Sequence, residues 1–378
     1  MVTIAVTAES EGEPRVAVSP ETVKKLTNLG CTVRVQSGAG LKARFSDSAL
    51  AAQGAVIVPT AAETLNGADI LLHVRRPAAD DVKALKRGAI VAAMLAPFDD
   101  RPGLDALAGT GASLMAMEFM PRISRAQSMD VLSSQANLAG YKAVINAAAM
   151  FGQAVPMMMT AAGTVPAAKV FIMGVGVAGL QAIATARRLG AIVSATDVRP
   201  ATKEQVASLG AKFVAVEDEE FKQAQTAAGY AKPMSAEYQK KQAELIASHI
   251  ANQDIVITTA LIPGRPAPKL VTAAMVESMK PGSVVVDLAA ERGGNTEVTQ
   301  PGQIIDHKGV IISGPLNLAG EVPVNASSLY AKNLLAFLET MIDKKEKVLN
   351  VNWDDEIIKG TLVAKDGKIV HPNLQQGA

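Results

Sequence analysis

Three glycines and an aspartate carry the clearest chemical signal in the chain. Gly174, Gly176 and Gly179 follow an apolar run that begins at Lys169, and Asp197 closes the next apolar run 18 residues after Gly179. In such a pattern the glycines permit a tight turn, close approach of the backbone to a pyrophosphate and close helix packing. The helix N-terminus that follows offers free N–H groups to the phosphates. The spacing therefore predicts a dinucleotide site.

The acidic residue predicts which dinucleotide is bound. A carboxylate at Asp197 accepts hydrogen bonds from the adenosine ribose and repels a 2′-phosphate, which favours NAD(H) over NADP(H). Arg199, two residues later, could reduce this preference for NAD(H), but we expect its side chain to be solvated. The cofactor-binding residues expected in this segment are Gly174, Val175, Gly176, Val177, Ala178, Gly179, Asp197, Val198 and Arg199.

A second glycine pair, Gly38 and Gly40, also follows an apolar run. No helical stripe of apolar residues comes directly after it, and the next helix is expected to start at Ser46 or Asp47. This pair is therefore predicted to form a turn without a nucleotide.

Composition excludes several other functions. The 37 Lys and Arg residues balance 36 Asp and Glu residues, so no basic excess calls for nucleic acid. Four scattered histidines and the single Cys31 offer no metal-ligand spacing, and one cysteine forms no internal disulfide, which favours a reducing cytoplasm. The N-terminus lacks a signal peptide pattern, and Pro156, Thr160, Pro166 and Lys169 interrupt the longest apolar stretch, so no membrane span is expected.

The elements that position these residues follow an alternating strand and helix pattern, which predicts an α/β fold. The expected strands of the first series are Thr3–Val6, Thr32–Val35, Ala55–Val58, Ile70–Val74, Ala89–Met94 and Ala112–Met117. Ser19 and Pro20 start the first helix and Gly30 ends it. A long helical stretch, Ser133–Met150, leads to a second series.

The second series contains the glycine pattern. Its expected strands are Val170–Met173, Ile192–Ala195, Phe213–Val216, Asp254–Thr259, Ser283–Asp287 and Val310–Ser313. A helix over Ser327–Met341 and a two-residue hairpin turn at Asp366-Gly367 follow. We expect two doubly wound, parallel-sheet, Rossmann-like domains with a cleft between them. Residues 1–132 and 319–378 would form one domain and residues 133–318 the NAD(H)-binding domain.

Several segments together resemble the NAD(H)-binding component of proton-translocating nicotinamide nucleotide transhydrogenase, over essentially the whole chain. These segments are Pro121–Val144, Met157–Val170, Gly174–Ala191, Thr196–Phe213, Ile257–Thr272 and Met279–Asn295. The stretch Glu13–Pro20 is also shared with alanine dehydrogenases, so Pro121–Val144 carries most of the discrimination.

The resemblance implies an activity and partners. The chain would form a homodimer at the cytoplasmic face of the inner membrane, attached peripherally through its partners. It would exchange hydride between its NAD(H) and the NADP(H) held by a separate subunit, in the direction from NADH to NADP⁺, while a membrane-spanning proton-channel subunit couples this transfer to proton flow. No metal and no nucleic acid are implied.

The alanine dehydrogenases set a chemical test. Oxidation of an amino acid requires a base that takes a proton while the hydride leaves. Hydride exchange between two nicotinamides moves no proton at carbon, so the protein needs only to position the two rings and exclude water. Alanine dehydrogenases carry a lysine and a histidine where this chain has Arg75 and Ala96. His73 would share a strand face with Arg75 and could replace the base, although a structural histidine is the expectation. An alanine-dehydrogenase-like enzyme and an NAD(H)-sensing module remain the alternatives.

The resemblance also assigns residues at the nicotinamide end. Arg122 and Asp130 would form an ion pair that shapes a loop, Gln127 would contact the nicotinamide ribose and the neighbouring nucleotide, and Ser133 would hold the carboxamide. The alternative is an ordinary approach to a helix with Ser133 as its N-cap.

Two further segments gain a role from the resemblance. The polar insertion Glu217–Asn252 would be a mobile lid with Tyr230 at its tip, or else a solvated helical hairpin. Ala260 and Leu261 complete the expected cofactor-binding residues.

Overall fold

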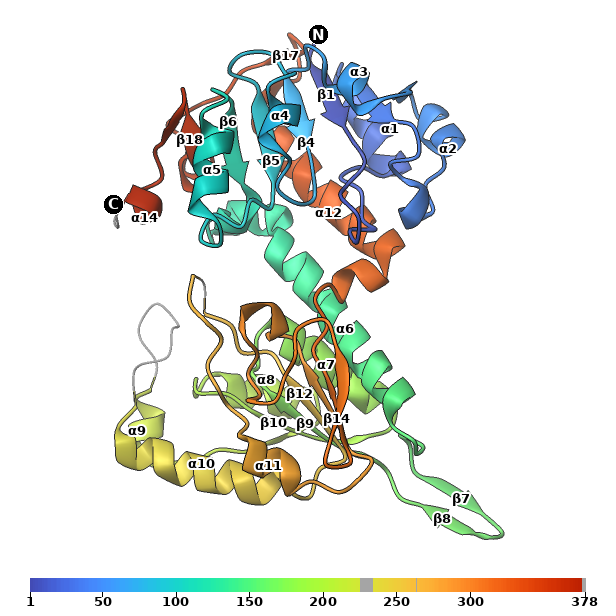
Figure 1. The fold of residues 1–378 in the computed structure, drawn as a ribbon, viewed down its shortest axis with the longest axis vertical. Helices are drawn as coiled ribbons and strands as arrows, with labels where there is room; N and C mark the ends of the chain where they lie inside the picture. Colours follow the sequence, from blue (N-terminus) through green and yellow to red (C-terminus); the bar gives the residue numbers. More distant parts are fainter. Residues whose placement is uncertain (225–233, 263, 376–378) are drawn as a thin grey trace. The chain divides into compact units, whose positions relative to one another are not determined.

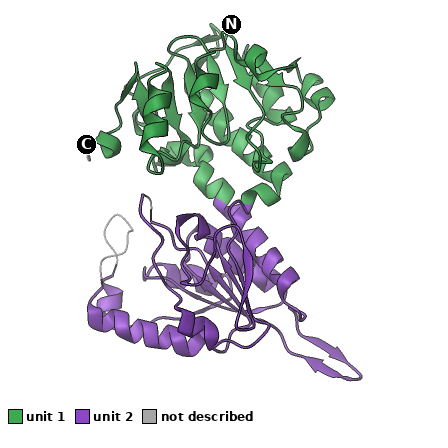
Figure 2. Cartoon of the chain, viewed as in Figure 1, with its two compact units in different colours: residues 1–135, 319–378 green, residues 136–318 purple. Residues whose placement is uncertain are grey.

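The computed structural model describes residues 1–224, 234–262 and 264–375 (Figure 1). The chain divides into two compact units (Figure 2). Unit 1 comprises residues 1–135 and 319–378, and unit 2 comprises residues 136–318. Both ends of the chain therefore belong to unit 1, and the middle of the chain forms unit 2.

Unit 1 is built on an eight-stranded sheet in the order β19-β18-β6-β5-β4-β1-β2-β3. The strands are β1 (Thr3–Val6), β2 (Thr32–Gln36), β3 (Val56–Val58), β4 (Ile70–Leu72), β5 (Ile90–Ala93), β6 (Ser113–Ala116), β18 (Leu362–Lys365) and β19 (Lys368–Ile369). Strands β1 to β6 are parallel, and the chain winds outward from β1 in both directions. The C-terminal hairpin β18-β19 adds an antiparallel edge beside β6.

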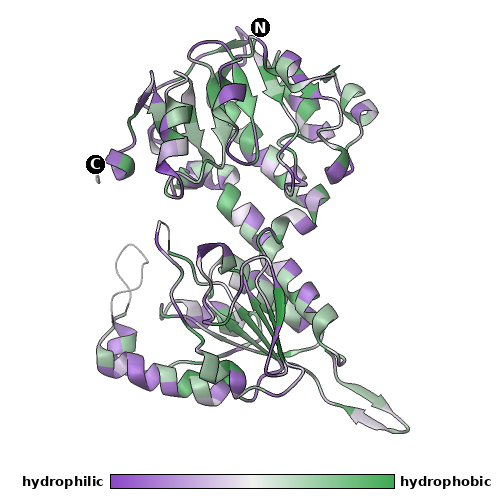
Figure 3. Cartoon of the chain, in the orientation of Figure 1, coloured by the Kyte–Doolittle hydropathy of each residue, from purple (hydrophilic) through white to green (hydrophobic). Residues whose placement is uncertain are grey.

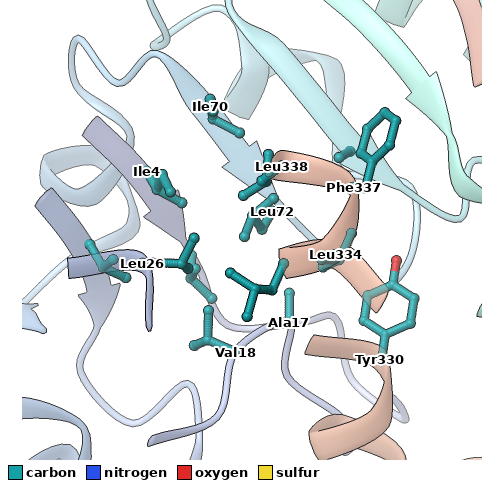
Figure 4. Packing of buried hydrophobic residues seen from close by; sticks show 14 of the residues in the cluster. Ile4, Ala17, Val18, Leu26, Ile70, Leu72, Tyr330, Leu334, Phe337 and Leu338 are labelled. Carbon is teal, nitrogen blue, oxygen red and sulfur yellow. The ribbon is translucent and has the colours of Figure 1, made fainter. Parts of the chain in front are cut away.

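Helices cover this sheet. They are α1 (Pro20–Asn28), α2 (Asp47–Ala51), α3 (Ala61–Leu65), α4 (Ala79–Val82), α5 (Arg101–Ala108), α12 (Pro323–Leu338), α13 (Glu356–Thr361) and α14 (Pro372–Gln375). Short 3-10 helices lie at Leu41–Ala43, Met117–Phe119, Ser124–Met129 and Ala319–Glu321, and β16 (Ile342–Asp343) pairs with β17 (Val348–Leu349). Helix α12 closes one core, in which Leu334, Phe337 and Leu338 pack with Ile4 and Leu72 of the central strands (Figure 4).

Unit 2 has a seven-stranded sheet in the order β11-β10-β9-β12-β13-β15-β14. The strands are β9 (Lys169–Met173), β10 (Ile192–Thr196), β11 (Lys212–Phe213), β12 (Ile255–Thr258), β13 (Val284–Asp287), β14 (Ile304–His307) and β15 (Val310–Ser313). All pairs are parallel except β14 with β15. The chain leaves β9 toward β10 on one side and later returns to β12 on the other. The carboxyl ends of β9 and β12 are therefore the switch point at which open α/β sheets bind ligands.

The helices of unit 2 are α7 (Val177–Arg188), α8 (Thr202–Ser208), α9 (Glu219–Lys222), α10 (Ala236–Ile250) and α11 (Ala273–Glu277), with a 3-10 helix at Ala290–Arg292. Helix α6 (Val131–Met150) begins in unit 1 and ends in unit 2. Figure 3 shows hydrophobic strands in both sheets and a largely hydrophilic α10.

The predicted α/β class and two parallel sheets are confirmed. Strand ends differ from prediction by a few residues, and some elements were not predicted, among them the β16-β17 pair, β14 and the β7-β8 hairpin. Strand β14 exposes alternate residues and pairs only with β15, so its sequence has no apolar run. The hairpin of β7 (Met158–Thr160) and β8 (Gly163–Val165) is exposed along its whole length, so no buried face marks it. Helix α12 begins at Pro323, before its expected start, because proline is favoured in the first helical turn.

The hairpin turn predicted at Asp366-Gly367 is confirmed, with positive φ values of 52° and 81°. Among the described helices, none combines the length and apolar character that a membrane span needs. Across the same residues, the His, Cys, Asp and Glu side chains form no cluster of three or more that could hold a metal ion.

Candidate nucleotide site

The turn from Gly174 to Gly179, named here the glycine turn, joins β9 to α7 at the switch point. Gly174 has a φ of 101°, and a Cβ on it would lie 2.6 Å from Thr259 Oγ1. A Cβ on Gly179 would lie 1.9 Å from the carbonyl oxygen of Gly174. Only glycine fits these two positions without a change in the backbone. Gly174 has a positive φ that other residues rarely adopt, and Gly179 lies too close to the backbone of Gly174 for a side chain.

The start of α7 is open. Its N-cap is Gly176, and among the described residues no capping side chain accepts a hydrogen bond from the helix start. A Cβ built on Gly176 would meet no atom within 4 Å, so this glycine is not required by packing. The first N–H groups of a helix lack partners within it and carry partial positive charge. The glycine turn therefore provides a cradle that suits a phosphate group.

Helix α6 supports this cradle from the other side, a feature that sequence analysis missed. Gly140 lies against the first turn of α7, and a Cβ on it would come within 2.0 Å of the Ala178 carbonyl oxygen. An isolated glycine in a helical pattern is a signal for such a close approach.

Asp197 lies directly after β10, and its carboxylate accepts hydrogen bonds from the glycine turn. Val175 N donates to Oδ2 at 2.8 Å, and Arg199 N donates to Oδ1 at 2.9 Å. The Arg199 guanidinium donates from Nε to Oδ1 at 2.8 Å and from Nη2 to Oδ2 at 2.9 Å. The expectation of a solvated Arg199 is wrong, because its guanidinium is paired with both carboxylate oxygens. These hydrogen bonds raise the pKa of Arg199 despite its partial burial.

Ala260 and Leu261 follow β12 and border the glycine turn. Thr259 Oγ1 donates to the Gly174 carbonyl at 3.0 Å. The buried amide of Asn295 holds both backbone groups of Ala260: Oδ1 accepts from Ala260 N at 3.0 Å, and Nδ2 donates to Ala260 O at 2.8 Å. Sequence analysis did not single out Asn295, although the preceding Gly293 and Gly294 with positive φ mark a close backbone approach.

The second set of predicted residues belongs to unit 1. Asp130 caps α6: Oδ1 accepts from Ser133 N at 2.9 Å, and Oδ2 accepts from Ser133 Oγ at 2.5 Å. The cap is therefore Asp130, and the alternative of Ser133 as N-cap is wrong. Arg122 is exposed, and within the described residues it forms no ion pair with Asp130.

A different arginine anchors this loop. Arg125 donates to both carboxylate oxygens of Asp355, at 2.7 and 2.8 Å, and Asn333 Nδ2 donates to the Ser128 carbonyl at 2.8 Å. Gln127 lies between these anchors on the 3-10 helix Ser124–Met129, with an exposed side chain. Within the described residues, the loop therefore holds Gln127 in place without a hydrogen bond to its side-chain amide, which is exposed.

The segments in which this chain differs from alanine dehydrogenases contain His73 and Ala96, and both make hydrogen bonds within unit 1. His73 is buried, and its Nδ1 lies 3.0 Å from Glu9 Oε2 and 2.7 Å from the Arg75 carbonyl. Burial lowers the pKa of His73, but the contacts with Glu9 outweigh it and raise the pKa above its usual value. Ala96 has a φ of 46°, and its N–H donates to Glu118 Oε1 at 2.6 Å. These contacts fit the structural histidine that was expected, and no imidazole stands at residue 96.

The remaining expected feature is the insertion. It contains α9 and α10, and Tyr238 on α10 donates from its hydroxyl to the Val216 carbonyl at 3.1 Å. Tyr230 lies outside the described residues.

Comparison with known proteins agrees with this picture. Family models described as the N-terminal and C-terminal domains of alanine dehydrogenase/PNT match residues 5–139 and 143–372. A chain of NAD(P) transhydrogenase subunit alpha from Rhodospirillum rubrum is 56% identical over 373 residues, which cover 97% of each chain.

Solved structures give the same result. A crystal structure of transhydrogenase from Sinorhizobium meliloti is 57% identical, with a TM-score of 0.89, and the match covers 97% of this chain and 100% of that one. An L-alanine dehydrogenase structure is 25% identical with a TM-score of 0.82, covering 99% of this chain and 98% of that one. The chain therefore belongs to the alanine dehydrogenase/PNT family, in which it is much more similar to transhydrogenase alpha subunits than to alanine dehydrogenase.

Proposed function

We propose that the chain is the NAD(H)-binding subunit of a proton-translocating transhydrogenase. It would exchange hydride directly between its own NAD(H) and NADP(H) on a partner subunit. The observation that carries the proposal is the open cradle at the start of α7, next to the Asp197 carboxylate. Its residues fit a dinucleotide, because Gly176 leaves room for a phosphate and Asp197 is an acceptor at the ribose position.

The residue assignments follow from this fit. Gly174–Gly179 would bind the pyrophosphate, and Asp197 with Val198 would contact the adenosine ribose, next to Arg199. Ala260 and Leu261 would line the far side of the cradle. When bound, the nicotinamide supplies the hydride. The exposed Gln127 would contact the nicotinamide ribose and Ser133 would hold the carboxamide, while Asp130 fixes the start of α6 beside them. Tyr230 would belong to a lid.

The chemistry favours transhydrogenation over amino-acid oxidation. The residue at the position of the alanine dehydrogenase histidine is Ala96, whose backbone N–H donates to Glu118. His73 donates from Nδ1 to groups of its own unit, so it is held as part of the structure and not as a base at an open site. Hydride exchange between two nicotinamides needs no proton transfer at carbon, so the chain needs no base for it.

We also propose a homodimer, and the β7-β8 hairpin supports it. Residues 157–165 contain no charged side chain, and Met157, Met159 and Val165 are 59%, 77% and 36% exposed. Figure 1 shows this hairpin extending away from the sheet of unit 2. An uncharged, exposed hairpin is typical of an interface. In this proposal the dimer works in the cytoplasm, held at the inner membrane by an NADP(H)-binding subunit and a proton-channel subunit.

The decisive experiment uses the purified chain with and without its partners. We expect the chain alone to bind NADH in calorimetry and to leave alanine, pyruvate and ammonia unchanged. Addition of an NADP(H)-binding transhydrogenase subunit should produce hydride transfer between the two nucleotides. Oxidation of alanine by the chain alone would support the alanine-dehydrogenase-like alternative. NADH binding without transfer in the reconstituted mixture would support a sensing module.

A further inference from the structure

The Asp197 carboxylate already has a full set of hydrogen bonds within the chain. Val175 N and Arg199 N donate to it from the backbone, and the Arg199 guanidinium donates twice more, all at 2.8 to 2.9 Å. A carboxylate offers about four acceptor positions. A ribose diol therefore finds no free position on Asp197 unless one of these donors leaves.

Only the guanidinium can leave without a change in the backbone. Val175 N belongs to the glycine turn, and the Arg199 backbone is held through its carbonyl, which accepts from Thr202 N at 3.1 Å and from Thr202 Oγ1 at 2.7 Å. The Arg199 side chain is one-third exposed, while that of Asp197 is 7% exposed, and the Arg199 guanidinium also donates from Nη2 to the Val175 carbonyl at 3.2 Å. The guanidinium therefore covers the carboxylate from the solvent side.

We propose that Arg199 competes with the adenosine ribose for Asp197, and that this competition sets both the affinity for NAD(H) and the discrimination against NADP(H). The inference rests on the proposed function, since it concerns the same site. In the nucleotide-free chain, the guanidinium occupies the acceptor positions that the ribose hydroxyls need. When NAD(H) binds, the ribose hydroxyls replace the Arg199 guanidinium as hydrogen-bond donors to Asp197.

The same pairing weakens the selection against a 2′-phosphate. Asp197 repels a phosphate through its negative charge, and a guanidinium within hydrogen-bond distance neutralises most of that charge. A displaced Arg199 also places a cation beside the ribose, where it attracts a 2′-phosphate. Lys203, the neighbouring cation on α8, is already paired with Glu217, so Arg199 is the cation whose partner must change.

The test compares Arg199→Met with the unaltered chain by calorimetry. Methionine keeps the aliphatic stem and removes every donor. We expect Arg199→Met to bind NADH about fivefold more tightly and NADPH more weakly, so that the ratio of the two affinities rises at least tenfold. The same change in ratio should appear with 5′-AMP and adenosine 2′,5′-bisphosphate, which contain the adenosine ribose without the nicotinamide.

Two further variants control for charge and folding. Lys203→Met removes a nearby cation that does not contact Asp197, and it should leave the affinity ratio unchanged. The double variant Asp197→Asn with Arg199→Met contains no unpaired buried charge, and it should bind NADH and NADPH with similar affinities. Thermal unfolding of each variant shows that it is folded at the temperature of the titration.

The outcomes are distinct. Weaker NADH binding by Arg199→Met would overturn the proposal, since Arg199 would then be a ligand contact and not a competitor. An unchanged ratio would overturn it as well. If the unaltered chain binds neither NADH nor 5′-AMP, the proposed function itself fails, which is a separate result from a failure of the competition.

Discussion

The two units contain the same strand-to-helix step at the centre of their sheets, but the two helices begin differently. In unit 1, residues 7–19 separate β1 from α1, and Ser19 and Thr22 form a capping box at the helix start. In unit 2, only Gly174–Gly176 separate β9 from α7, and the N-cap is Gly176, which has no side chain to cap the helix. The first helix satisfies its own N–H groups, whereas the second leaves them open to a ligand.

The main charged pair of each unit differs in the same way, because the pair in unit 1 is buried and the pair in unit 2 is partly exposed. In unit 1, Glu13 and Arg15 are both about 97% buried and paired at 2.7 Å, and Gln135 accepts from Arg15 at 2.9 Å. In unit 2, the charged pair of Asp197 and Arg199 has one partner facing solvent. Buried pairs in closed networks hold a structure together, whereas a pair with an exposed member can exchange partners. We therefore expect the unit 1 network to contribute stability and unit 2 to bind the nucleotide.

The largest expected effect follows from removal of Arg15. Arg15→Met should destabilise the chain by about 3–5 kcal/mol, because the Glu13 carboxylate stays buried and loses the hydrogen bonds that Arg15 donates. Denaturant unfolding measures this loss. Lys25→Met, which removes an exposed pair with Glu21 on α1, is the matched control and should leave the free energy of unfolding unchanged. If both variants changed the free energy of unfolding by the same amount, the buried pair would contribute no more stability than the exposed pair, and the prediction would be wrong.

Acid should affect unit 1 through the same network. Burial raises the pKa of Glu13, but the contacts with Arg15 and then Arg75 outweigh it and lower the pKa from 4.5 to about 2. A lowered folded-state pKa stabilises the fold above pH 4.5, and this contribution of about 3 kcal/mol is lost as the pH falls from 4.5 to 2. The slope of unfolding free energy against pH should be smaller in Glu13→Gln. An identical slope in both proteins would show that Glu13 is not the group that titrates.

The glycine turn tests the assignment of binding to unit 2. Gly179→Ala places a Cβ 1.9 Å from the Gly174 carbonyl oxygen, so we expect a loss of stability of about 3 kcal/mol together with a loss of NADH binding. Gly176→Ala is the matched variant, because its Cβ meets no atom of the protein. It should keep normal stability and still lose about 2 kcal/mol of NADH binding, or about 30-fold in affinity. Normal NADH binding by Gly176→Ala would place the phosphates elsewhere.

Sequence reasoning predicted most of the fold because the central strands are apolar runs and several helix starts, such as those of α1 and α2, have a local capping signal. The expected start near Ser46 or Asp47 is confirmed, with Ser46 as the N-cap of α2. The turn expected at Gly38 and Gly40 is also present, and the Asp47 carboxylate accepts from Gly38 N at 3.0 Å. Elements without a buried face, such as β14 and the β7-β8 hairpin, gave no such signal.

The site was less predictable because its contacts depend on the path of the backbone and not on sequence spacing alone. The pairing of Arg199 with Asp197 depends on the path of the chain after β10, and spacing alone is compatible with a solvated arginine. The Arg125 and Asp355 pair joins residues 230 positions apart, so no local pattern reveals it. The capping role of Asp130 was missed because Ser133, three residues later, has an equally suitable side chain. Local patterns located the site, while long-range contacts determine which side chains are free to bind.

The smallest expected effect separates rate from affinity, and it concerns Gln127 in unit 1. If unit 2 supplies nucleotide binding, a change at Gln127 should slow hydride transfer while NADH binding stays near normal, because phosphates and adenosine provide most of the binding energy. Gln127→Asn keeps the amide but shortens the side chain by one methylene. Donor and acceptor carbons must approach to about 3–3.5 Å, so this loss of reach should slow transfer about tenfold, equivalent to about 1.4 kcal/mol.

Single-turnover kinetics of the chain with an NADP(H)-binding subunit measure the transfer rate, and calorimetry measures NADH affinity separately. Gln205→Asn, a change of the same size on α8 of unit 2, is the control and should alter neither quantity. A Gln127→Asn variant with normal transfer would show that its amide does not position the nicotinamide. A variant that loses affinity and rate together would mean that unit 1 also contributes binding energy, and the division of roles between the two units would then have to be abandoned.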